Sequence, residues 1–206
     1  MEKQEKQKIL EDLLAAEPVP MAPDGIGRIK KDPGLYLITC DVSDGYLYAG
    51  KAGRHGGEGT RGRVRKHRVS SGGLGGDNLA RALAKDGELS QAIGGPDSLA
   101  TSARRREFFA EHCDCRTVTS PDFSDQLLSE VETFVIGRLC PRLNVRDNPR
   151  LSASDCGRAK DAATHEPASA LGQPAGSPRV PAAVYVLAAA MTVLLFLLIY
   201  LGRRRG

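Results

Sequence analysis

Residues 34–50 have the sequence GLYLITCDVSDGYLYAG, which contains two short apolar segments separated by turn-forming residues. Gly34–Cys40 is short and apolar and follows a proline, a pattern that predicts a β-strand. Tyr46–Ala49 is a second strand-like stretch, and the residues between the two, Asp41–Gly45, favour a turn. The whole stretch therefore predicts a β-hairpin.

The residues after the hairpin predict a loop, three helices and one more strand. A glycine-rich loop, Gly50–Gly62, leads into a short basic helix at Arg63–Val69, and a second helical period covers Asn78–Lys85. The segment Glu107–Val118 contains the third expected strand, and Asp125–Leu139 is the clearest helix because it has a continuous apolar stripe. The order β, β, α, α, β, α predicts an α+β fold, a small antiparallel three-stranded sheet flanked by helices.

The chain has 206 residues, which is room for one ordinary domain with some chain left over. Residues 1–26 are interpreted as an N-terminal helix, Lys3–Ala16, that packs on the domain, followed by a Pro-rich lead-in. The folded domain is expected at residues 27–146. Residues 147–179 are rich in Ala, Ser, Pro and Gly without an apolar period, which is typical of a flexible linker.

Residues 180–202 are almost wholly apolar and carry no charge. A helix needs about 20 such residues to cross a bilayer core, and Tyr185 and Tyr200 near the ends suit the membrane interface. The stretch predicts a single transmembrane helix in a lipid bilayer, with residues 203–206 as a basic tail. A buried core helix is the alternative, but a small soluble domain rarely encloses a helix that is apolar on every side.

The compartment is inferred from the cysteines and the N-terminus. The five cysteines are an odd number, and the N-terminal residues lack the apolar run of a secretory signal. Both features favour free thiols in a reducing compartment, and hence a single-pass membrane protein whose folded domain is cytoplasmic. The three arginines at 203–205 favour a cytoplasmic tail instead, so the orientation stays open, with more weight on the missing signal.

The formal net charge of +4 is mild, but the basic residues are clustered. One cluster comprises Lys51, Arg54, Arg61, Arg63, Arg65, Lys66 and Arg68, and a second comprises Arg104, Arg105 and Arg106. Such clusters suit a nucleic-acid backbone and imply salt-sensitive binding with little sequence preference. Anionic lipid is the alternative partner for the same surface.

Four short motifs follow one another between residues 34 and 144, a little over half of the chain. They are Gly34-Leu35-Tyr36, Tyr48-Ala49-Gly50, Arg63-Val64-Arg65-Lys66-His67, and Glu132-Thr133-Phe134-Val135-Ile136 with Pro141-Arg142-Leu143-Asn144 after it. In this order and spacing they resemble the GIY-YIG nuclease family. Leu35 and Ala49 stand where the family has isoleucine, and the loop before Arg63 is longer than usual, so Arg61 and Arg65 are rivals for the arginine position.

The residue types themselves fit phosphodiester hydrolysis, which needs a deprotonated water, a Lewis acid and compensation of negative charge. Glu132 is a hard oxygen donor suited to Mg²⁺ or another divalent cation, and Arg63 offers a fork for phosphate oxygens. Tyr36 and Tyr48 lie on adjacent strands, but a phenol is a poor base unless nearby cations lower its pKa. We expect Arg63, Lys51, His67 and the metal to provide those charges.

The resemblance implies the same roles. It makes Tyr36 the base or the residue that orients the attacking water, and it makes Tyr48 an organiser of the same site, with the proton-accepting tyrosine left open. It places Arg63 on the scissile phosphate, Glu132 on the metal, and His67 in a supporting position. The residues expected to bind substrate are Lys51, Arg61, Arg65, Lys66 and Asn144.

The expected function is a membrane-anchored, metal-dependent endonuclease acting on DNA, with RNA as the alternative substrate. An inactive nuclease-like module that tethers nucleic acid or a protein to the membrane is the competing hypothesis, although every expected catalytic residue type is present. A membrane adaptor that resembles a nuclease by chance is disfavoured by the ordered motifs. A zinc site at His112, Cys113 and Cys115 is disfavoured because the cysteines lack the usual C-x-x-C spacing.

Overall fold

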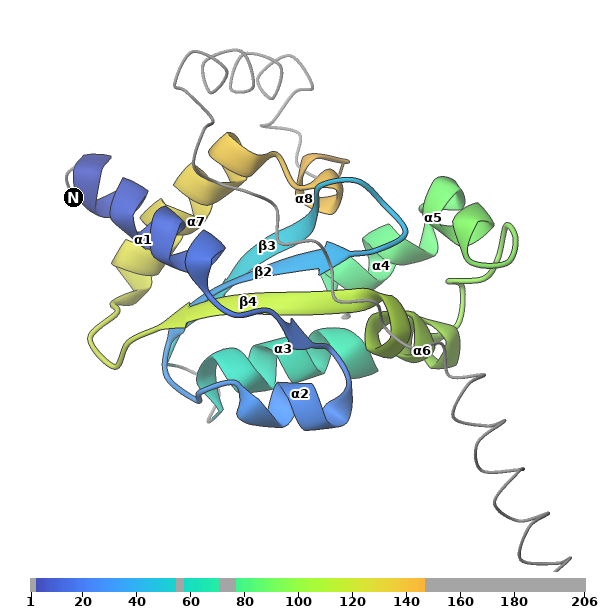
Figure 1. Cartoon of the computed structure of the whole chain (residues 1–206), viewed down its shortest axis with the longest axis horizontal. Helices are drawn as coiled ribbons and strands as arrows, with labels where there is room; N and C mark the ends of the chain where they lie inside the picture. Colours follow the sequence, from blue (N-terminus) through green and yellow to red (C-terminus); the bar gives the residue numbers. More distant parts are fainter. Residues whose placement is uncertain (1–2, 55–57, 71–76, 147–206) are drawn as a thin grey trace, which may run out of the picture. The chain divides into compact units, whose positions relative to one another are not determined.

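The expected hairpin forms one side of a four-stranded antiparallel sheet. Strands β2 (Gly34–Cys40) and β3 (Tyr46–Ala52) form the hairpin, and β4 (Cys113–Thr119) pairs with the other side of β2. A short strand, β1 (Val19–Pro20), pairs with β4, so the strand order is β1-β4-β2-β3. The computed structural model describes residues 3–54, 58–70 and 77–146 (Figure 1).

The prediction of an α+β fold with an antiparallel sheet is confirmed, but the prediction of three strands is wrong. The missed strand, β1, has two residues and lies in the Pro-rich lead-in, where the sequence has no alternation to indicate it. Proline is tolerated at this position because β1 is an edge strand. One side of an edge strand has no neighbouring strand, so a missing backbone N–H there costs no hydrogen bond of the sheet.

Eight helices complete the part of the chain that the structure describes. They are α1 (Lys3–Ala15), α2 (Pro23–Arg28), α3 (Gly59–Val69), α4 (Asn78–Ala84), α5 (Gly87–Ala92), α6 (Ser102–His112), α7 (Asp125–Leu139) and α8 (Arg142–Arg146). Four of them begin at a side chain that accepts a backbone N–H of the first turn, namely those of Asp77, Asp86, Thr101 and Ser124.

Two boundaries differ from the sequence prediction. Helix α3 begins at Gly59 rather than Arg63, because the backbone N–H and the hydroxyl of Thr60 both donate to the carbonyl of Asp32. Helix α6 occupies the first half of the segment in which a strand was expected, so β4 begins only at Cys113. Both boundaries depend on tertiary contacts, which the local sequence pattern does not reveal.

Helices cover both faces of the sheet (Figure 1). Helices α1 and α7 pack over Leu35 and Leu37 of β2, whereas α2, α3, α4 and α6 pack over Tyr36 and Ile38. Successive side chains of a strand point to opposite faces, so a strand covered on both sides is apolar throughout, as β2 is. This burial fixes the position of Tyr36 on the α3 side.

Two arginines, one on α6 and one on α8, make hydrogen bonds that hold their helices in place. Arg105, expected as part of a basic surface cluster, is instead buried, and its guanidinium donates to the carbonyls of Leu99 and Ala100 at 2.8 Å. Arg142 of α8 forms a bidentate ion pair with the carboxylate of Asp86, and each of the two N···O distances is 2.8 Å. Such paired geometry holds two helices in one arrangement.

The described thiols agree in part with the expectation of free cysteines. Cys40, Cys113 and Cys115 are free and buried, whereas Cys140 is disulfide-bonded, so the expectation is wrong for that residue. An odd number of cysteines leaves at least one thiol unpaired, but it does not prevent the others from pairing.

No helix in the described ranges is both long enough and apolar enough to span a membrane. The expected linker at 147–179, the transmembrane helix at 180–202 and the basic tail at 203–206 lie outside the described residues.

Candidate active site

Most residues expected in the site gather around β3, the end strand of the sheet. Helices α3, α7 and α8 all contact this strand. The sheet supplies Tyr36, Tyr48 and Lys51, α3 supplies Arg63 and His67, α7 supplies Glu132, and α8 supplies Asn144. The register pairs Tyr36 with Gly50 and Ile38 with Tyr48, so both tyrosines lie on the sheet face that α3 covers.

A buried chain of three side chains runs from Tyr36 through His67 to Asp77. The hydroxyl of Tyr36 lies 2.5 Å from Nε2 of His67, and Nδ1 of His67 lies 2.6 Å from Oδ2 of Asp77. The other carboxylate oxygen of Asp77 accepts the backbone N–H of Leu79 at 2.9 Å. A carboxylate only accepts, so His67 carries its proton on Nδ1, and Nε2 is left to accept the hydroxyl proton of Tyr36.

The protonation states of His67 and Asp77 support this assignment. Burial lowers the pKa of His67 below its ordinary value, although the hydrogen bond to Asp77 acts in the opposite direction. Burial opposes ionisation of Asp77 too, yet the hydrogen bond from His67 and the charge of Arg63 keep the pKa of Asp77 below its ordinary value. The imidazole is therefore neutral and the carboxylate charged near neutral pH.

The two tyrosines do not have the lowered pKa that was expected from their basic neighbours. Burial raises the pKa of Tyr36, with a further rise from Tyr48, and burial raises the pKa of Tyr48 to about 12. Arg63 acts in the expected direction on both phenols but is outweighed by desolvation. Both phenols are therefore neutral, and Tyr36 can accept a proton only while it passes its own to His67.

Arg63, rather than Arg61 or Arg65, is the arginine that contacts Tyr36 and Asp77. It lies one helical turn before His67, hydrogen-bonds to Tyr36 and approaches Asp77 with an N···O distance of 3.9 Å. The side chain of Arg63 is 37% exposed, so Arg63 lies between the buried side chains and the protein surface. Arg61 donates to the carbonyl of Ile29 at 2.6 Å, and Arg65 pairs with Glu58, so neither takes this position.

Glu132 and Lys51 face each other on the α7 side of β3. The carboxylate oxygen of Glu132 lies 3.9 Å from Nζ of Lys51, which also donates to the hydroxyl of Ser129. Burial raises the pKa of Glu132, against the opposing effects of Lys51 and Arg63. A partly buried carboxylate with a raised pKa gains free energy from a further cation beside it.

This environment fits one largely hydrated Mg²⁺. Within residues 3–54, 58–70 and 77–146, no three His, Cys, Asp or Glu side chains converge as a metal-binding group. Within these residues, Glu132 would be the carboxylate that holds the ion. Mg²⁺ commonly keeps several waters and is held through one or two carboxylates and the phosphate of the substrate, so one carboxylate is a sufficient donor set.

Asn144, which was expected to bind substrate, contacts the backbone of β3 in the structure. Its side-chain oxygen accepts the backbone N–H of Ala49 at 2.6 Å, and its amide nitrogen donates to the carbonyl of the same residue at 2.9 Å. The amide thus satisfies the free edge of β3 as a neighbouring strand would. Asn144 fixes the strand that carries Tyr48 and Lys51.

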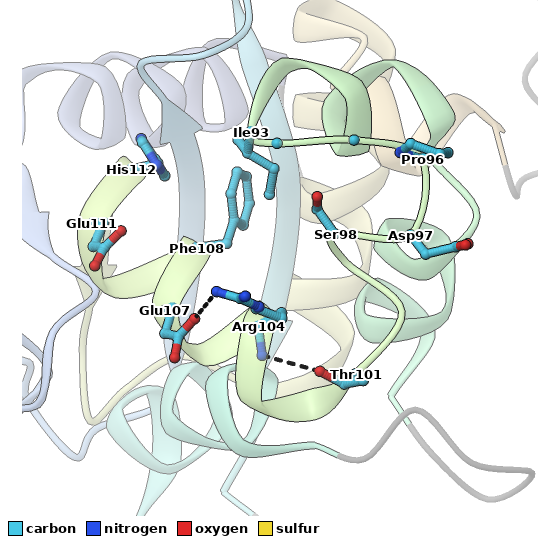
Figure 2. A pocket seen from close by; sticks show the side chains of 12 residues that line it. Ile93, Pro96, Asp97, Ser98, Thr101, Arg104, Glu107, Phe108, Glu111 and His112 are labelled. Atoms are coloured by element: carbon cyan, nitrogen blue, oxygen red, sulfur yellow. Dashed lines mark hydrogen bonds and ion pairs between the residues drawn. The ribbon is translucent and has the colours of Figure 1, made fainter.

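A hollow of about 570 Å³ opens beside Arg63. Its lining includes Lys51, Arg63, Arg65 and Lys66, with Glu58 as its acidic residue. A second hollow, of about 600 Å³, lies beside α6 and includes none of the expected site residues (Figure 2). Its lining mixes charges, with Arg104 paired to Glu107 at 3.1 Å, so the first hollow is the better place for a polyanion.

Sequence reasoning missed Asp77 as a member of the site. Its position directly before a helical period could have identified it as a helix N-cap, which it is. The second carboxylate oxygen is directed at His67 by the packing of α4 against α3, and no local pattern contains that contact.

Neither a protein-family model nor a curated protein matches this chain.

Gly50 provides a test of the packing at the site. A Cβ atom there would lie 2.3 Å from the hydroxyl oxygen of Tyr36 and 2.5 Å from its ring carbon. Because this ring is buried and held by His67, we expect Gly50→Ala to lower the free energy of unfolding by about 1–3 kcal/mol, measured by thermal unfolding. Gly87→Ala is the control, since its Cβ would meet nothing within 4 Å. Equal stability of the two variants would show that the Tyr36 hydroxyl is not held against β3.

Proposed function

We propose that this chain is a membrane-anchored, Mg²⁺-dependent endonuclease of the GIY-YIG type that hydrolyses phosphodiester bonds in DNA. The observation that carries the proposal is the series of close buried contacts from Tyr36 through His67 to Asp77, with Arg63 above it and a basic hollow beside Arg63. Glu132 is near enough to Arg63 for the guanidinium charge to lower the pKa of Glu132, against the effect of burial. The proposed anchor is the apolar segment 180–202, with the folded domain on the cytoplasmic side.

Substrate binding is assigned to the basic residues of the hollow. Lys51, Arg65 and Lys66 attract the DNA backbone by charge, and Arg63 takes the scissile phosphate with its guanidinium fork. Mg²⁺, when bound at Glu132, supplies a Lewis acid for the negative charge of the phosphate. Because contacts to the backbone carry no sequence information, we expect recognition of DNA shape rather than of bases.

Proton transfer is assigned to the three buried side chains Tyr36, His67 and Asp77. In the free protein Arg63 bonds to Tyr36, whose side chain is 1% exposed, so a phosphate that draws Arg63 outward would admit a water to the phenol. The water gives its proton to Oη of Tyr36 as the phenol proton moves to Nε2 of His67, and Asp77 stabilises the imidazolium. The water oxygen bonds to phosphorus, the bond to the leaving oxygen breaks, and that oxygen takes a proton from solvent.

An inactive module that tethers nucleic acid to the membrane is the second candidate. The near-complete burial of Tyr36 favours it, because a phenol closed to solvent does not contact a substrate. The basic hollow would serve binding equally well in both cases.

A cleavage assay on the full chain, purified in detergent, separates the two candidates. We expect nicking of supercoiled plasmid and branched DNA with Mg²⁺ but not with chelator, and a loss of about 100-fold or more in Glu132→Gln. Glu130→Gln is the matched control, since Glu130 lies on the same helix and pairs with Lys6 on the surface. No cleavage by the unmodified chain, with salt-sensitive DNA binding retained, would favour the tether. Cleavage of RNA alone would correct the substrate.

A further inference from the structure

Two cysteines away from the candidate active site lie directly opposite each other in the sheet. Cys40 ends β2, Cys113 begins β4, and the register pairs them. The backbone N–H of Asp41 donates to the carbonyl of His112 at 3.0 Å, which makes Cys40 and Cys113 a pair without backbone hydrogen bonds between them.

This kind of pair brings the backbones closest together. Non-hydrogen-bonded pairs in antiparallel sheets have Cα atoms about 4.5 Å apart, and disulfides join Cα atoms about 4.4–6.8 Å apart. The two cysteines therefore lie where a bond between them requires little movement of β2 and β4. Cys115, the other free cysteine among the described residues, is paired in register with Ile38 and not with a cysteine.

The surroundings make the two thiols chemically unequal. The thiols are hydrogen-bonded to each other, and Sγ of Cys40 lies 3.1 Å from the hydroxyl of Ser43 and accepts the backbone N–H groups of Val42 and Ser43. Consecutive N–H groups of a turn form a small anion-binding concavity, which here suits a thiolate. Cys40 retains 8% exposure, whereas Cys113 is fully buried behind it.

Ionisation of the two thiols follows from this arrangement. The hydrogen bond from Cys113 and those from the turn lower the pKa of Cys40 to about 6, against the effect of burial. Burial raises the pKa of Cys113, and the neighbouring Cys40 raises it further. Near neutral pH the outer sulfur is a thiolate and the inner one a thiol, which is the combination of an attacking and a resolving cysteine.

We propose that Cys40 and Cys113 form a reversible redox pair that reacts with hydroperoxides. The Cys40 thiolate attacks one peroxide oxygen, the O–O bond breaks, and Cys40 becomes a sulfenic acid as hydroxide or alkoxide leaves. Sγ of Cys113 then attacks Sγ of Cys40, and the disulfide forms as the sulfenic oxygen leaves as water with the Cys113 proton. The two electrons lost by the thiols reduce the peroxide, and a reducing dithiol restores the pair.

The pair is tested on the full chain treated with hydrogen peroxide, followed by alkylation with iodoacetamide and peptide mass spectrometry. We expect a peptide linked through Cys40 and Cys113 that disappears on treatment with dithiothreitol. Cys115→Ser should leave this link unchanged, and Cys113→Ser should yield a sulfenic acid at Cys40 that dimedone traps.

A second measurement needs no substitution and so does not depend on whether a variant folds. Alkylation of Cys40 in the untreated chain should rise with pH around a midpoint of about 6. Absence of the linked peptide after peroxide treatment, or a Cys40 midpoint at the ordinary thiol value of about 8.5, would overturn the proposal. Both results are independent of DNA cleavage.

Discussion

Arg63→Ala should lower the single-turnover rate of DNA cleavage by about 100- to 1,000-fold, the loss found when one preorganised donor to a developing charge is removed. Arg63 is the arginine of α3 that hydrogen-bonds to Tyr36 and lies near Asp77 while still reaching the surface. Its loss removes both the phosphate contact and the group that covers the buried chain. The rate is measured with enzyme in excess over labelled DNA.

Arg65→Ala is the matched control for this prediction. Arg65 lies on the same helix and lines the same hollow, but its guanidinium pairs with Glu58. Its removal should weaken DNA binding modestly and leave the saturated rate nearly unchanged, because it contacts backbone charge alone. Arg63→Lys should not restore the rate, since an ammonium lacks the planar fork. Equal losses in Arg63→Ala and Arg65→Ala would remove Arg63 from the chemistry and leave it as one more basic side chain.

Asp77→Asn should lower the rate near neutral pH by about 100-fold or more. The side-chain oxygen of asparagine can still accept the N–H of Leu79, so the N-cap of α4 is kept. Its amide nitrogen then faces Nδ1 of His67 and donates to it, which moves the imidazole proton to Nε2. Tyr36 thereby loses its acceptor, and the proton transfer from water has no destination within the site.

The pH dependence separates this role from a structural one. The proposed proton transfer requires neutral His67, whose pKa lies below its ordinary value of 6.5. The unmodified chain should therefore lose activity only as the pH falls through that lowered pKa. Asp77 raises the pKa of His67, so Asp77→Asn should move this acidic fall to still lower pH. Asp86→Asn, at another buried N-cap, is the control and should affect stability without moving the profile. An acidic limb that stays in place in Asp77→Asn would make Asp77 a structural cap only.

The sequence predicts those parts of the fold in which pattern and packing agree. Strand β2 is apolar along its length because helices cover both of its faces, and α7 has an apolar stripe because one side of it lies on the sheet. These signals are local, so they can be read without the tertiary structure. The four motifs likewise indicate which strands and helices should meet.

The remaining features depend on contacts between distant residues. The two residues of β1 form a strand only because β4 presents a free edge to them. Arg105 lies between two exposed arginines, and nothing in the local sequence distinguishes it from them. It is nevertheless buried, because its guanidinium can donate to the carbonyls of Leu99 and Ala100. Asp77 and Asn144 illustrate the same limit within the site, since their partners are His67 and the backbone of Ala49.

We propose above that water cleaves a phosphodiester bond in this site. This can be tested by incubating the full chain with DNA and Mg²⁺ in water enriched in a heavy oxygen isotope. The masses of the new phosphate ends are then measured by mass spectrometry. If water is the nucleophile, each cut should contain one heavy oxygen, and Glu132→Gln should make at least about 100-fold fewer cuts. DNA that remains intact, or cuts whose phosphate ends contain no oxygen from the solvent, would contradict it.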